Sequence, residues 1–328
     1  MTSPKTTKLN TGHPMPQLGF GTWQAAPGVV ADSVYEALVT GYRHLDLAKV
    51  YANQPEVGRG IKRALDDIPG LHRSHIFVTS KLWNHCHRPD LVEAALRDTL
   101  EELQLDYLDL YLMHWPVAFK AGEHLFPKGE DGKIVLDQSV SICQTWKAMT
   151  ELPKSKVRSV GVSNFTIEHL EAIIQDSGVV PAVNQVERHP RLPQTALIDY
   201  CNKKHIVTTA YSAFGNNMAG LPLLIEAPDL KAVADRLSKA NGRQVTPAQL
   251  ILAWCQRDGQ TVIPKSVTPA RIRQNFEHVE LDDDAIRVIQ EMGRHQKRFN
   301  VPRDMGVDIN VFDEEQEKDA PNKVVIKL

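Results

Sequence analysis

The sequence has few cysteines and no grouping of them that suggests a bridge or a metal site. Four of its 328 residues are cysteine, Cys86, Cys143, Cys201 and Cys255, and no two form a CxxC pair. A disulfide framework or a zinc cluster is therefore not expected, and we expect reduced thiols and no metal site. That usage is typical of a cytoplasmic protein.

Signals for membranes and for secretion are also missing. The longest apolar stretches, such as the one from Leu250 to Trp254, are far shorter than the roughly 18 residues that cross a bilayer. The segment from Met1 to Gln17 is polar and interrupted by prolines, without the apolar h-region of a secretory signal. We therefore expect a soluble, cytoplasmic protein with no membrane partner.

Net charge is nearly absent, because 38 basic side chains face 40 acidic ones. A nucleic-acid binder more often has a basic excess, and a disordered chain has fewer apolar residues than the 42% found here. We expect no nucleic-acid partner, although a locally basic site stays possible.

The length allows one domain or two, since α/β barrels of about 250 residues or more form single domains.

Short apolar runs typical of strands alternate with longer amphipathic stretches typical of helices. Strands are expected at 18–20, 43–46, 76–80, 108–114, 157–163, 182–185, 207–211 and 261–263. Helices are expected at 29–40, 55–65, 90–103, 167–175, 193–203, 230–240 and 246–257. The run from Leu108 to His114 is almost wholly apolar, which is typical of a parallel strand covered on both faces. Residues 119–138 are polar and contain several glycines, and they predict a long loop.

Eight strands, each followed by a crossover long enough for a helix, predict an α/β fold of the (β/α)8 TIM-barrel type. The rival is an open dinucleotide-binding sheet, which would carry a GxGxxG turn after its first strand. Here Gly19 and Gly21 are followed by Thr22 and Trp23, and no third glycine opens a helix. We therefore predict a single domain over 1–328, with a core at 9–299 and a tail at 300–328 that folds over one mouth of the barrel.

Four polar side chains lie near the carboxyl ends of consecutive strands, the face on which such barrels do chemistry. Asp46 ends the second strand, Tyr51 follows in its loop, Lys81 ends the third strand and His114 ends the fourth. Taken alone, Asp46 is more often a helix cap, Tyr51 a surface aromatic and His114 as often a core histidine. Lys81 is harder to dismiss, because lysine is rarely buried without a partner. Their joint occurrence at one face favours a catalytic site.

These side chains suit the reduction of a carbonyl group. A free tyrosine has a pKa near 10 and is a poor proton donor at neutral pH, but an adjacent ammonium favours the phenolate. We expect Asp46 to hold Lys81 charged, and Lys81 to lower the pKa of Tyr51, which then acts as general acid. His114 would hydrogen-bond the same carbonyl oxygen and orient it. The hydride must come from a cofactor, because no side chain donates one.

The sequence resembles the aldo-keto reductases from about Leu9 to about Phe299. The motifs that carry the resemblance are PQLGFGTW at 16–23, GYRHLDLAKVYANQPEVG at 41–58, VTSKLW at 78–83, LDLYLMHWP at 108–116, VRSVGVSNF at 157–165 and IPKSVTPARIRQNF at 263–276. The resemblance implies a barrel with an N-terminal β-hairpin cap and a catalytic tetrad of Asp46, Tyr51, Lys81 and His114. It also implies NADPH as the cofactor and a monomer as the oligomeric state.

The resemblance implies a cofactor site as well. It places Ser163, Asn164 and Gln185 at the nicotinamide carboxamide and stacks Tyr211 on the ring. The resemblance places Gly21, Thr22, Trp23 and Asp46 at the same end of the cofactor. It places the loop residues Ser212, Phe214 and Asn217 toward the pyrophosphate. The residues that it implies for binding the adenosine 2′-phosphate are Lys265, Ser266, Val267, Thr268, Arg271, Gln274 and Asn275. Basic and hydroxyl side chains suit a phosphate in any case. The alternative for that last set is an ordinary helix start capped by Thr268.

Substrate choice is expected to depend on aromatic residues near the tetrad, on the loop at 118–138 and on the tail beyond Arg298. The pocket residues implied are Trp23, Tyr51, Trp83, His114, Trp115 and Phe119. The HLDLAKVYANQPEVG motif is most similar to the fungal glycerol dehydrogenase and glyceraldehyde reductase branch of the family. That similarity implies reduction of a short hydroxyaldehyde such as glyceraldehyde, reversible as a polyol dehydrogenase.

Two alternatives stay open at this point, and a third is discounted. An aldopentose such as xylose or arabinose is the nearest alternative substrate. An NADPH-binding regulatory subunit would keep the barrel, but the filled tetrad gives this little weight. A barrel glycosidase would need two carboxylates flanking a sugar, and neither Asp46 nor Glu187 lies in a fitting motif.

One loop departs from the family's usual pattern. Where the family usually has a Pro-Leu-Gly-Ser run, this sequence has AFGNN at 213–217, which leaves the contacts of that loop open.

Overall fold

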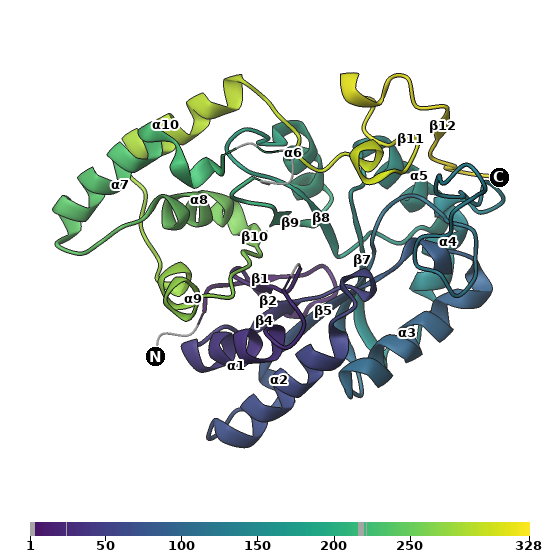
Figure 1. Ribbon diagram of the computed structural model, residues 1–328, viewed down its shortest axis with the longest axis horizontal. Helices are drawn as coiled ribbons and strands as arrows, with labels where there is room; N and C mark the ends of the chain where they lie inside the picture. The colour runs from purple at the N-terminus through teal and green to yellow at the C-terminus, as the bar shows by residue number, and fades with distance from the viewer. Residues whose placement is uncertain (1–3, 24, 216–219, 221) are drawn as a thin grey trace.

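The computed structural model describes residues 4–23, 25–215, 220 and 222–328. Eight parallel strands are paired in sequence order (Figure 1). They are β3 (Phe20–Gly21), β4 (His44–Asp46), β5 (Phe77–Leu82), β6 (Leu108–Met113), β7 (Val157–Ser163), β8 (Val183–Glu187), β9 (Val207–Tyr211) and β10 (Thr261–Val262). A parallel bridge between Leu18 and Val262 joins the last strand to the first. The predicted (β/α)8 barrel is confirmed, with the first strand shifted from 18–20 to Phe20–Gly21.

A β-hairpin covers the amino-terminal end of the barrel. Its strands β1 (Thr6–Lys8) and β2 (Pro14–Pro16) pair antiparallel. Leu9 and Met15 of the hairpin are buried in one cluster with Phe77, Leu110 and other residues of the barrel strands. Because Phe77 is the first residue of β5, the hairpin lies at the end of the barrel opposite the strand termini that carry the polar side chains. The implied hairpin cap is confirmed.

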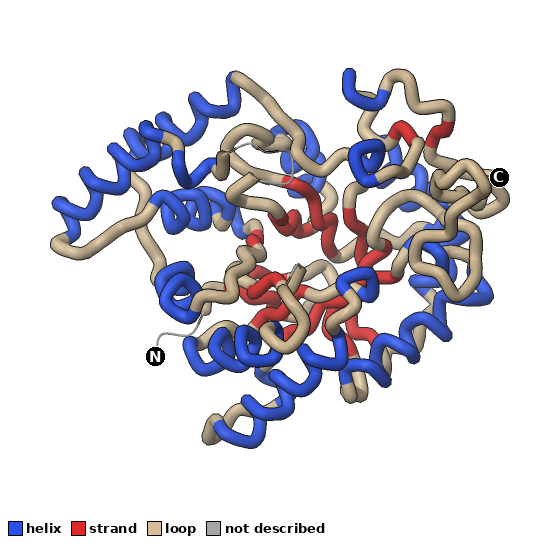
Figure 2. Tube along the Cα trace, viewed as in Figure 1, coloured by secondary structure: helices blue, strands red, loops and turns tan. Residues whose placement is uncertain are grey.

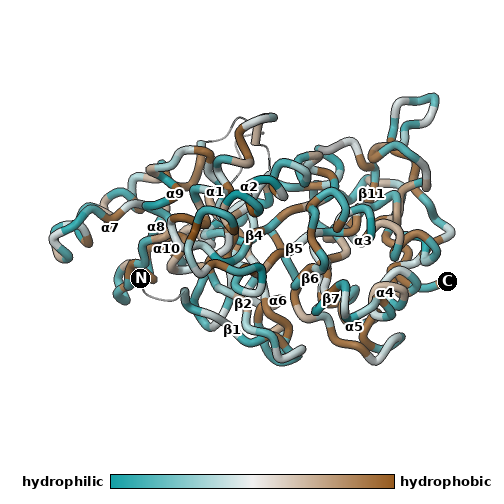
Figure 3. Tube along the Cα trace, turned by 90° about the horizontal axis from the view of Figure 1, so that it is seen from below, coloured by the Kyte–Doolittle hydropathy of each residue, from teal (hydrophilic) through white to brown (hydrophobic). Residues whose placement is uncertain are grey.

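The helices lie around the strands (Figure 2). They are α1 (Val30–Thr40), α2 (Gln54–Asp67), α3 (Pro89–Leu103), α4 (Ile142–Thr150), α5 (Ile167–Ser177), α6 (Thr195–Lys203), α7 (Pro228–Asn241), α8 (Pro247–Cys255), α9 (Pro269–Phe276) and α10 (Asp283–Glu291). Hydrophilic residues are frequent along outer helices such as α7 (Figure 3). No helix in the described part of the chain is long and apolar enough to cross a membrane.

Close packing between α1 and α2 depends on a glycine of α2. Gly60 of α2 lies against α1, and a Cβ on it would be 2.6 Å from the carbonyl oxygen of Ala31. Any side chain there would push α1 and α2 apart, which explains glycine inside a helix despite its low helix propensity. This contact holds the helix that follows Tyr51 against its neighbour.

Helix α4 is absent from the elements expected from sequence. Ser141 caps it, since its hydroxyl accepts from the backbone N–H of Gln144 and the Gln144 side chain accepts from the Ser141 N–H. This Ser-x-x-Gln capping box was the available signal. The apolar stripe that follows it, Ile142, Trp146 and Met149, is buried. The helix is only 9 residues long, and it comes directly after a polar loop.

The tail runs along the carboxyl-terminal mouth of the barrel and ends beside α4 (Figure 1). It contains β11 (Ile309–Asn310) and β12 (Asn322–Lys323), which pair in parallel. The backbone N–H of Ile142 donates to the carbonyl of Val325 at 2.8 Å. The tail is therefore packed against the barrel in the way the sequence predicted, and it also contains short strands that the sequence did not predict.

Candidate active site

The four predicted tetrad residues come from three consecutive βα units. Asp46 is the last residue of β4, Lys81 lies in β5 and His114 directly follows β6. Tyr51 lies in a 3-10 turn, Lys49–Tyr51, after β4. The Lys81 ammonium is 2.5 Å from Asp46 Oδ1, donates to the Leu47 carbonyl at 2.7 Å and lies 3.4 Å from the Tyr51 hydroxyl. The structure therefore brings carboxylate, ammonium and phenol into contact.

The Lys81–Asp46 ion pair is fully buried and well hydrogen-bonded. Burial lowers the pKa of Lys81, and the attraction of Asp46 opposes that shift. The second Asp46 oxygen accepts a hydrogen bond from Gln185 Nε2 at 2.6 Å. Both carboxylate oxygens thus have donors, which a buried ion pair needs in order to be tolerated. Sequence reasoning missed the Gln185–Asp46 contact, because 139 residues separate the two positions.

The pKa of Tyr51 differs from the sequence-based expectation. Burial raises it well above its usual value, and the negative charge of Asp46 raises it further. The net shift is therefore upward, opposite to the lowered pKa expected from the neighbouring Lys81. The physical reason is that burial of the phenol dominates, and that Asp46, in direct contact with Lys81, offsets the lysine charge. Tyr51 consequently keeps its proton at neutral pH.

His114 is neutral at pH 7. Its pKa lies well below the usual value because of burial, with smaller contributions from the charges of Lys81 and His87. Its ring meets the Tyr51 ring edge-on at 6.0 Å between centroids and the Trp83 ring at 5.1 Å. Its Nδ1 has no hydrogen-bond partner among the described residues. One ring nitrogen of a neutral imidazole carries a proton, so His114 can donate a hydrogen bond without being charged.

The residues expected at the nicotinamide form one hydrogen-bonded network with the tetrad. The Ser163 hydroxyl donates to the Gln185 carbonyl at 2.7 Å. Asn164 donates to the His114 carbonyl at 2.9 Å and accepts from the Tyr211 hydroxyl at 2.7 Å. Asn164 has a φ of 66°, a left-handed conformation that asparagine tolerates better than most residues. These side chains are therefore fixed in place before any ligand binds.

Residues expected at the other parts of the cofactor lie on neighbouring segments. The Gly21 N–H donates to the Pro264 carbonyl at 2.9 Å, which brings the end of β3 beside the segment that begins at Lys265. Thr22 donates through its hydroxyl to the Asp46 carbonyl at 3.0 Å. Ser212 and Phe214 are partly exposed, whereas Asn217 lies outside the described residues.

The segment after β10 presents basic and hydroxyl groups at the surface. Lys265, Val267, Thr268 and Arg271 are exposed, Ser266 and Gln274 are partly exposed, and Asn275 is buried. Thr268 occupies the N-cap position of α9, but its side chain makes no capping hydrogen bond in the described structure. The helix start expected here, with Thr268 at the N-cap position, is therefore present, but the Thr268 hydroxyl does not supply the capping hydrogen bond. The Thr268 hydroxyl and the cations of Lys265 and Arg271 fit an anionic group such as a phosphate.

Aromatic residues and the tail make an apolar cluster beside the tetrad. Trp83, Trp115 and Phe119 are buried, and Trp23 is 36% exposed. The cluster also contains Val117 and three tail residues, Val307, Ile309 and Val311. The sequence predicted that the tail contributes here but not which of its residues do, because the tail has no clear periodicity.

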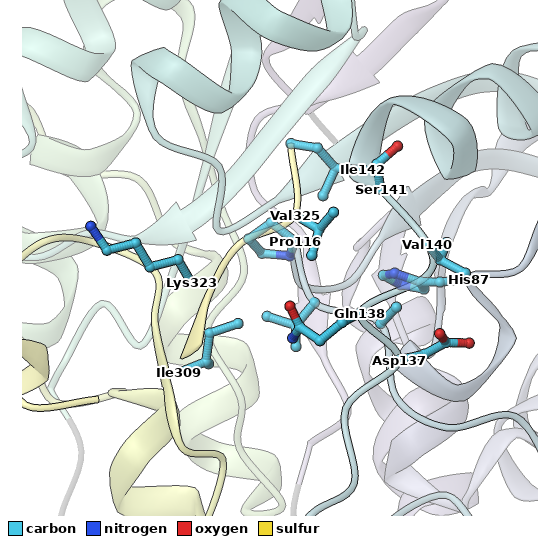
Figure 4. Close-up of a pocket in the computed structure, with 12 residues that line it drawn as sticks. His87, Pro116, Asp137, Gln138, Val140, Ser141, Ile142, Ile309, Lys323 and Val325 are labelled. Atoms are coloured by element: carbon cyan, nitrogen blue, oxygen red, sulfur yellow. The ribbon is translucent and has the colours of Figure 1, made fainter. Parts of the chain in front are cut away.

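A small cavity lies between the tail and the loop after β6 (Figure 4). Side chains that line it include those of His87, Pro116, Ser141 and Ile309. Its volume of about 10 Å³ has room for roughly one water molecule. None of the tetrad residues lines it, so it is separate from the tetrad, although Ile309 of the apolar cluster lies at its edge.

Comparisons with known proteins agree with this geometry. The model of the "Aldo/keto reductase family" matches residues 17–294. The chain belongs to the aldo/keto reductase family. It is 65% identical to a D/L-glyceraldehyde reductase of Hypocrea jecorina, with 100% of each chain covered. It is 44% identical to human aldo-keto reductase family 1 member A1, with 82% of each chain covered. The solved structure of the aldose reductase from Schistosoma japonicum is similar with a TM-score of 0.85 at 36% identity, covering 95% of this chain and 99% of that one.

Membership identifies this aldo/keto reductase as an oxidoreductase that acts on carbonyl groups. The family resemblance inferred from the sequence motifs is thereby confirmed. A regulatory protein without enzymatic activity loses its remaining support, since the chain also keeps all four tetrad side chains at one mouth of the barrel.

Proposed function

We propose that this aldo/keto reductase uses NADPH to reduce a short hydroxyaldehyde, glyceraldehyde or a close analogue, to its alcohol. The observation that carries the chemistry is the contact of Lys81 with both Asp46 and Tyr51, beside a neutral His114. The full-length similarity to the Hypocrea jecorina D/L-glyceraldehyde reductase supports this substrate class. We further propose that the reaction runs in reverse as a polyol oxidation.

Tyr51 acts as the general acid in this proposal. Hydride adds to the carbonyl carbon while the Tyr51 hydroxyl donates its proton to the carbonyl oxygen. The phenol holds that proton in the resting site because its pKa is high, and the Lys81 ammonium at 3.4 Å stabilises the phenolate left after transfer. Water then returns a proton to Tyr51.

His114 orients the substrate. A neutral imidazole can donate one hydrogen bond to the carbonyl oxygen, and this hydrogen bond strengthens as negative charge develops there. Trp83, Trp115 and Phe119 supply an apolar surface, and Trp23 lies at the exposed edge. We propose that a short aldehyde places its oxygen within hydrogen-bond reach of both the Tyr51 hydroxyl and the His114 imidazole, whose rings lie edge to face.

NADPH supplies the hydride when it is bound. Ser163, Asn164 and Gln185 offer the hydroxyl and amide groups that suit a carboxamide, and Tyr211 would stack on the ring. Gly21, Thr22, Trp23, Ser212 and Phe214 continue the site, and Val267, Gln274 and Asn275 would complete its phosphate end. The cations of Lys265 and Arg271, with the hydroxyls of Ser266 and Thr268, favour NADPH over NADH because only NADPH carries the adenosine 2′-phosphate.

The remaining features of the proposal concern the whole chain. We propose that it works as a cytoplasmic monomer and as one domain over 1–328, without nucleic acid. Four free cysteines support the cytoplasmic location, and the balanced charge supports the absence of a nucleic-acid partner.

The test follows NADPH absorbance with the purified protein and a panel of glyceraldehyde, xylose, arabinose, glucuronate and benzaldehyde. We expect glyceraldehyde to have the highest kcat/KM, and NADH in place of NADPH to lower it. A higher kcat/KM for xylose or arabinose would reassign the substrate to the aldopentoses. No turnover of any aldehyde would overturn the proposal.

A further inference from the structure

Glu187 is a buried carboxylate that none of the proposed catalytic steps uses. It is the last residue of β8, and its side chain is fully buried. Oε1 accepts hydrogen bonds from His189 Nε2 at 2.8 Å and from the Phe299 backbone N–H at 2.7 Å. Oε2 accepts from the Asn300 backbone N–H at 2.8 Å. One carboxylate thus holds the first residues of the tail.

Glu187 lies close to the groups expected to hold the nicotinamide. It follows Gln185 by two positions, so both side chains leave β8 on the same face. It is paired in register with Tyr211 on β9. Asn300 continues the connection, since its side-chain amide donates to the Ser212 hydroxyl at 3.3 Å. Glu187 therefore joins the strand ends of the site to the start of the tail.

The tail segment beyond this anchor folds back on itself. Arg298 pairs with Glu314 through two nitrogens, with an Nη2–Oε1 distance of 2.7 Å, and its guanidinium lies 3.7 Å from the centroid of the Phe312 ring. The segment between them contains Val307, Ile309 and Val311, which pack in the apolar cluster with Trp115 and Phe119. The wall of the proposed pocket thus belongs to a loop that is fixed at its base by Glu187.

The charge state of Glu187 fits this role. Burial alone would raise the pKa of its carboxyl, but hydrogen bonds from His189 and from residues 299 and 300 outweigh burial and hold the pKa below its usual value. The ionised form accepts from all three donors, whereas a neutral amide or acid would turn one of its own hydrogens toward them.

We infer that Glu187 is a positioning residue for the substrate: it fixes the backbone at Phe299 and Asn300 and thereby holds the tail wall at Val307 to Val311 against the pocket. It touches neither the reacting atoms nor the tetrad. Its loss would loosen one wall of the pocket and weaken substrate binding and size selection, while proton transfer from Tyr51 would continue. The inference rests on the proposed function only for the substrate of its kinetic test.

The first variant is Glu187→Gln, which keeps the size of the side chain and replaces one acceptor oxygen by an NH2 donor. We expect KM for glyceraldehyde to rise by about tenfold, which is about 1.4 kcal/mol of substrate binding, since the amide replaces one of the acceptor oxygens that hold the tail wall. We expect kcat and the Kd of NADPH to stay within about twofold, because the change removes substrate positioning rather than a transition-state contact. The ratio of kcat/KM for benzaldehyde to that for glyceraldehyde should rise as the wall loosens.

The matched control is Asp109→Asn at the opposite end of the barrel. Asp109 is the second residue of β6 and is 5% exposed. Its carboxylate accepts a hydrogen bond from the Val78 N–H at 3.0 Å and pairs with Arg73 and Arg158. It resembles Glu187 in burial and in its backbone donor but is remote from the tail. We expect Asp109→Asn to lower stability without raising KM.

Amide hydrogen exchange supplies a readout that does not depend on activity. Peptides covering residues 299–312 should exchange faster in Glu187→Gln than in the wild type and should be unchanged in Asp109→Asn. If Glu187→Gln does not fold, Glu187→Asp keeps the charge but withdraws the oxygens from the two amides, and the same readouts apply.

Unchanged KM and unchanged exchange in a folded Glu187 variant would overturn the inference, as would an equal rise of KM in Asp109→Asn. If the wild type fails to reduce glyceraldehyde, the proposed function fails, while exchange at residues 299–312 still tests the anchoring role on its own.

Discussion

Lys81 is fully buried, yet its ammonium lies within reach of three oxygens, from Asp46, Leu47 and Tyr51. The sequence predicted a partner for it, because a lysine inside an apolar strand is costly without one. It did not predict the direction of the Tyr51 pKa shift. That direction depends on how closely Asp46 offsets the lysine charge and on how deeply the phenol is buried, and strand position does not specify either quantity.

The charge state of His114 leads to a prediction for the pH dependence of reduction. Its pKa lies well below 6.5, so the neutral imidazole persists on the acid side of neutrality and is lost only when the pH falls far below 6.5. We expect kcat/KM for glyceraldehyde to be flat between pH 6 and pH 8, since that parameter reports ionisations of the free enzyme. Circular dichroism across the same range controls for unfolding. A loss of activity with a midpoint near pH 6.5 that disappears in His114→Gln would contradict a neutral His114.

At the scale of elements, the strand ends were easier to predict than some of the helices. Most of the strands are short, largely apolar runs with a polar residue at or just after their end, and Asp46, Lys81 and His114 lie at or next to such ends. Helix α4 was missed because its 9 residues follow a polar loop. Its capping box at Ser141 and Gln144 is a local signal that could have located it.

Helix α10 offers a test of a helix start. Asp282 caps it by accepting from the Ala285 N–H at 2.9 Å and pairs with Arg236 of α7 through two hydrogen bonds. The Arg236 interaction, aided by the cap, lowers the pKa of Asp282 to about 2. We expect Asp282→Ala to lower the free energy of unfolding by about 1 kcal/mol at pH 7, a usual cost for losing a cap, in urea denaturation. Asp282→Asn, which can still cap, should lose less.

The sign of the pH effect follows from the direction of that shift. A lowered pKa in the folded state stabilises the fold above the unfolded-state pKa of about 3.8, and this contribution is lost as the pH falls toward 2. The difference between wild type and Asp282→Ala should therefore be smaller at about pH 3 than at pH 7. An equal difference at both pH values would mean that the carboxylate charge contributes nothing there.

For the whole molecule, the barrel and the tetrad were predictable because both follow from a repeated local pattern. Eight strand-and-helix units fix the fold, and the fold brings the carboxyl ends of the strands to one mouth. The contacts that hold the tail were not predictable. Glu187 and Phe299 are 112 residues apart, and a carboxylate that accepts from backbone N–H groups leaves no residue pattern in the partner segment. The hydrogen bond between Gln185 and Asp46 was missed for the same reason.

The central claim is that Tyr51 donates the proton in NADPH-dependent reduction of a short hydroxyaldehyde. The most direct measurement is kcat for glyceraldehyde in Tyr51→Phe, together with the Kd of NADPH from fluorescence titration. We expect kcat to fall by about 10² to 10⁴, the usual contribution of a general acid, with the Kd within about twofold of the wild-type value. Turnover at the wild-type rate in a variant that binds NADPH normally would contradict the assignment of Tyr51 as the acid.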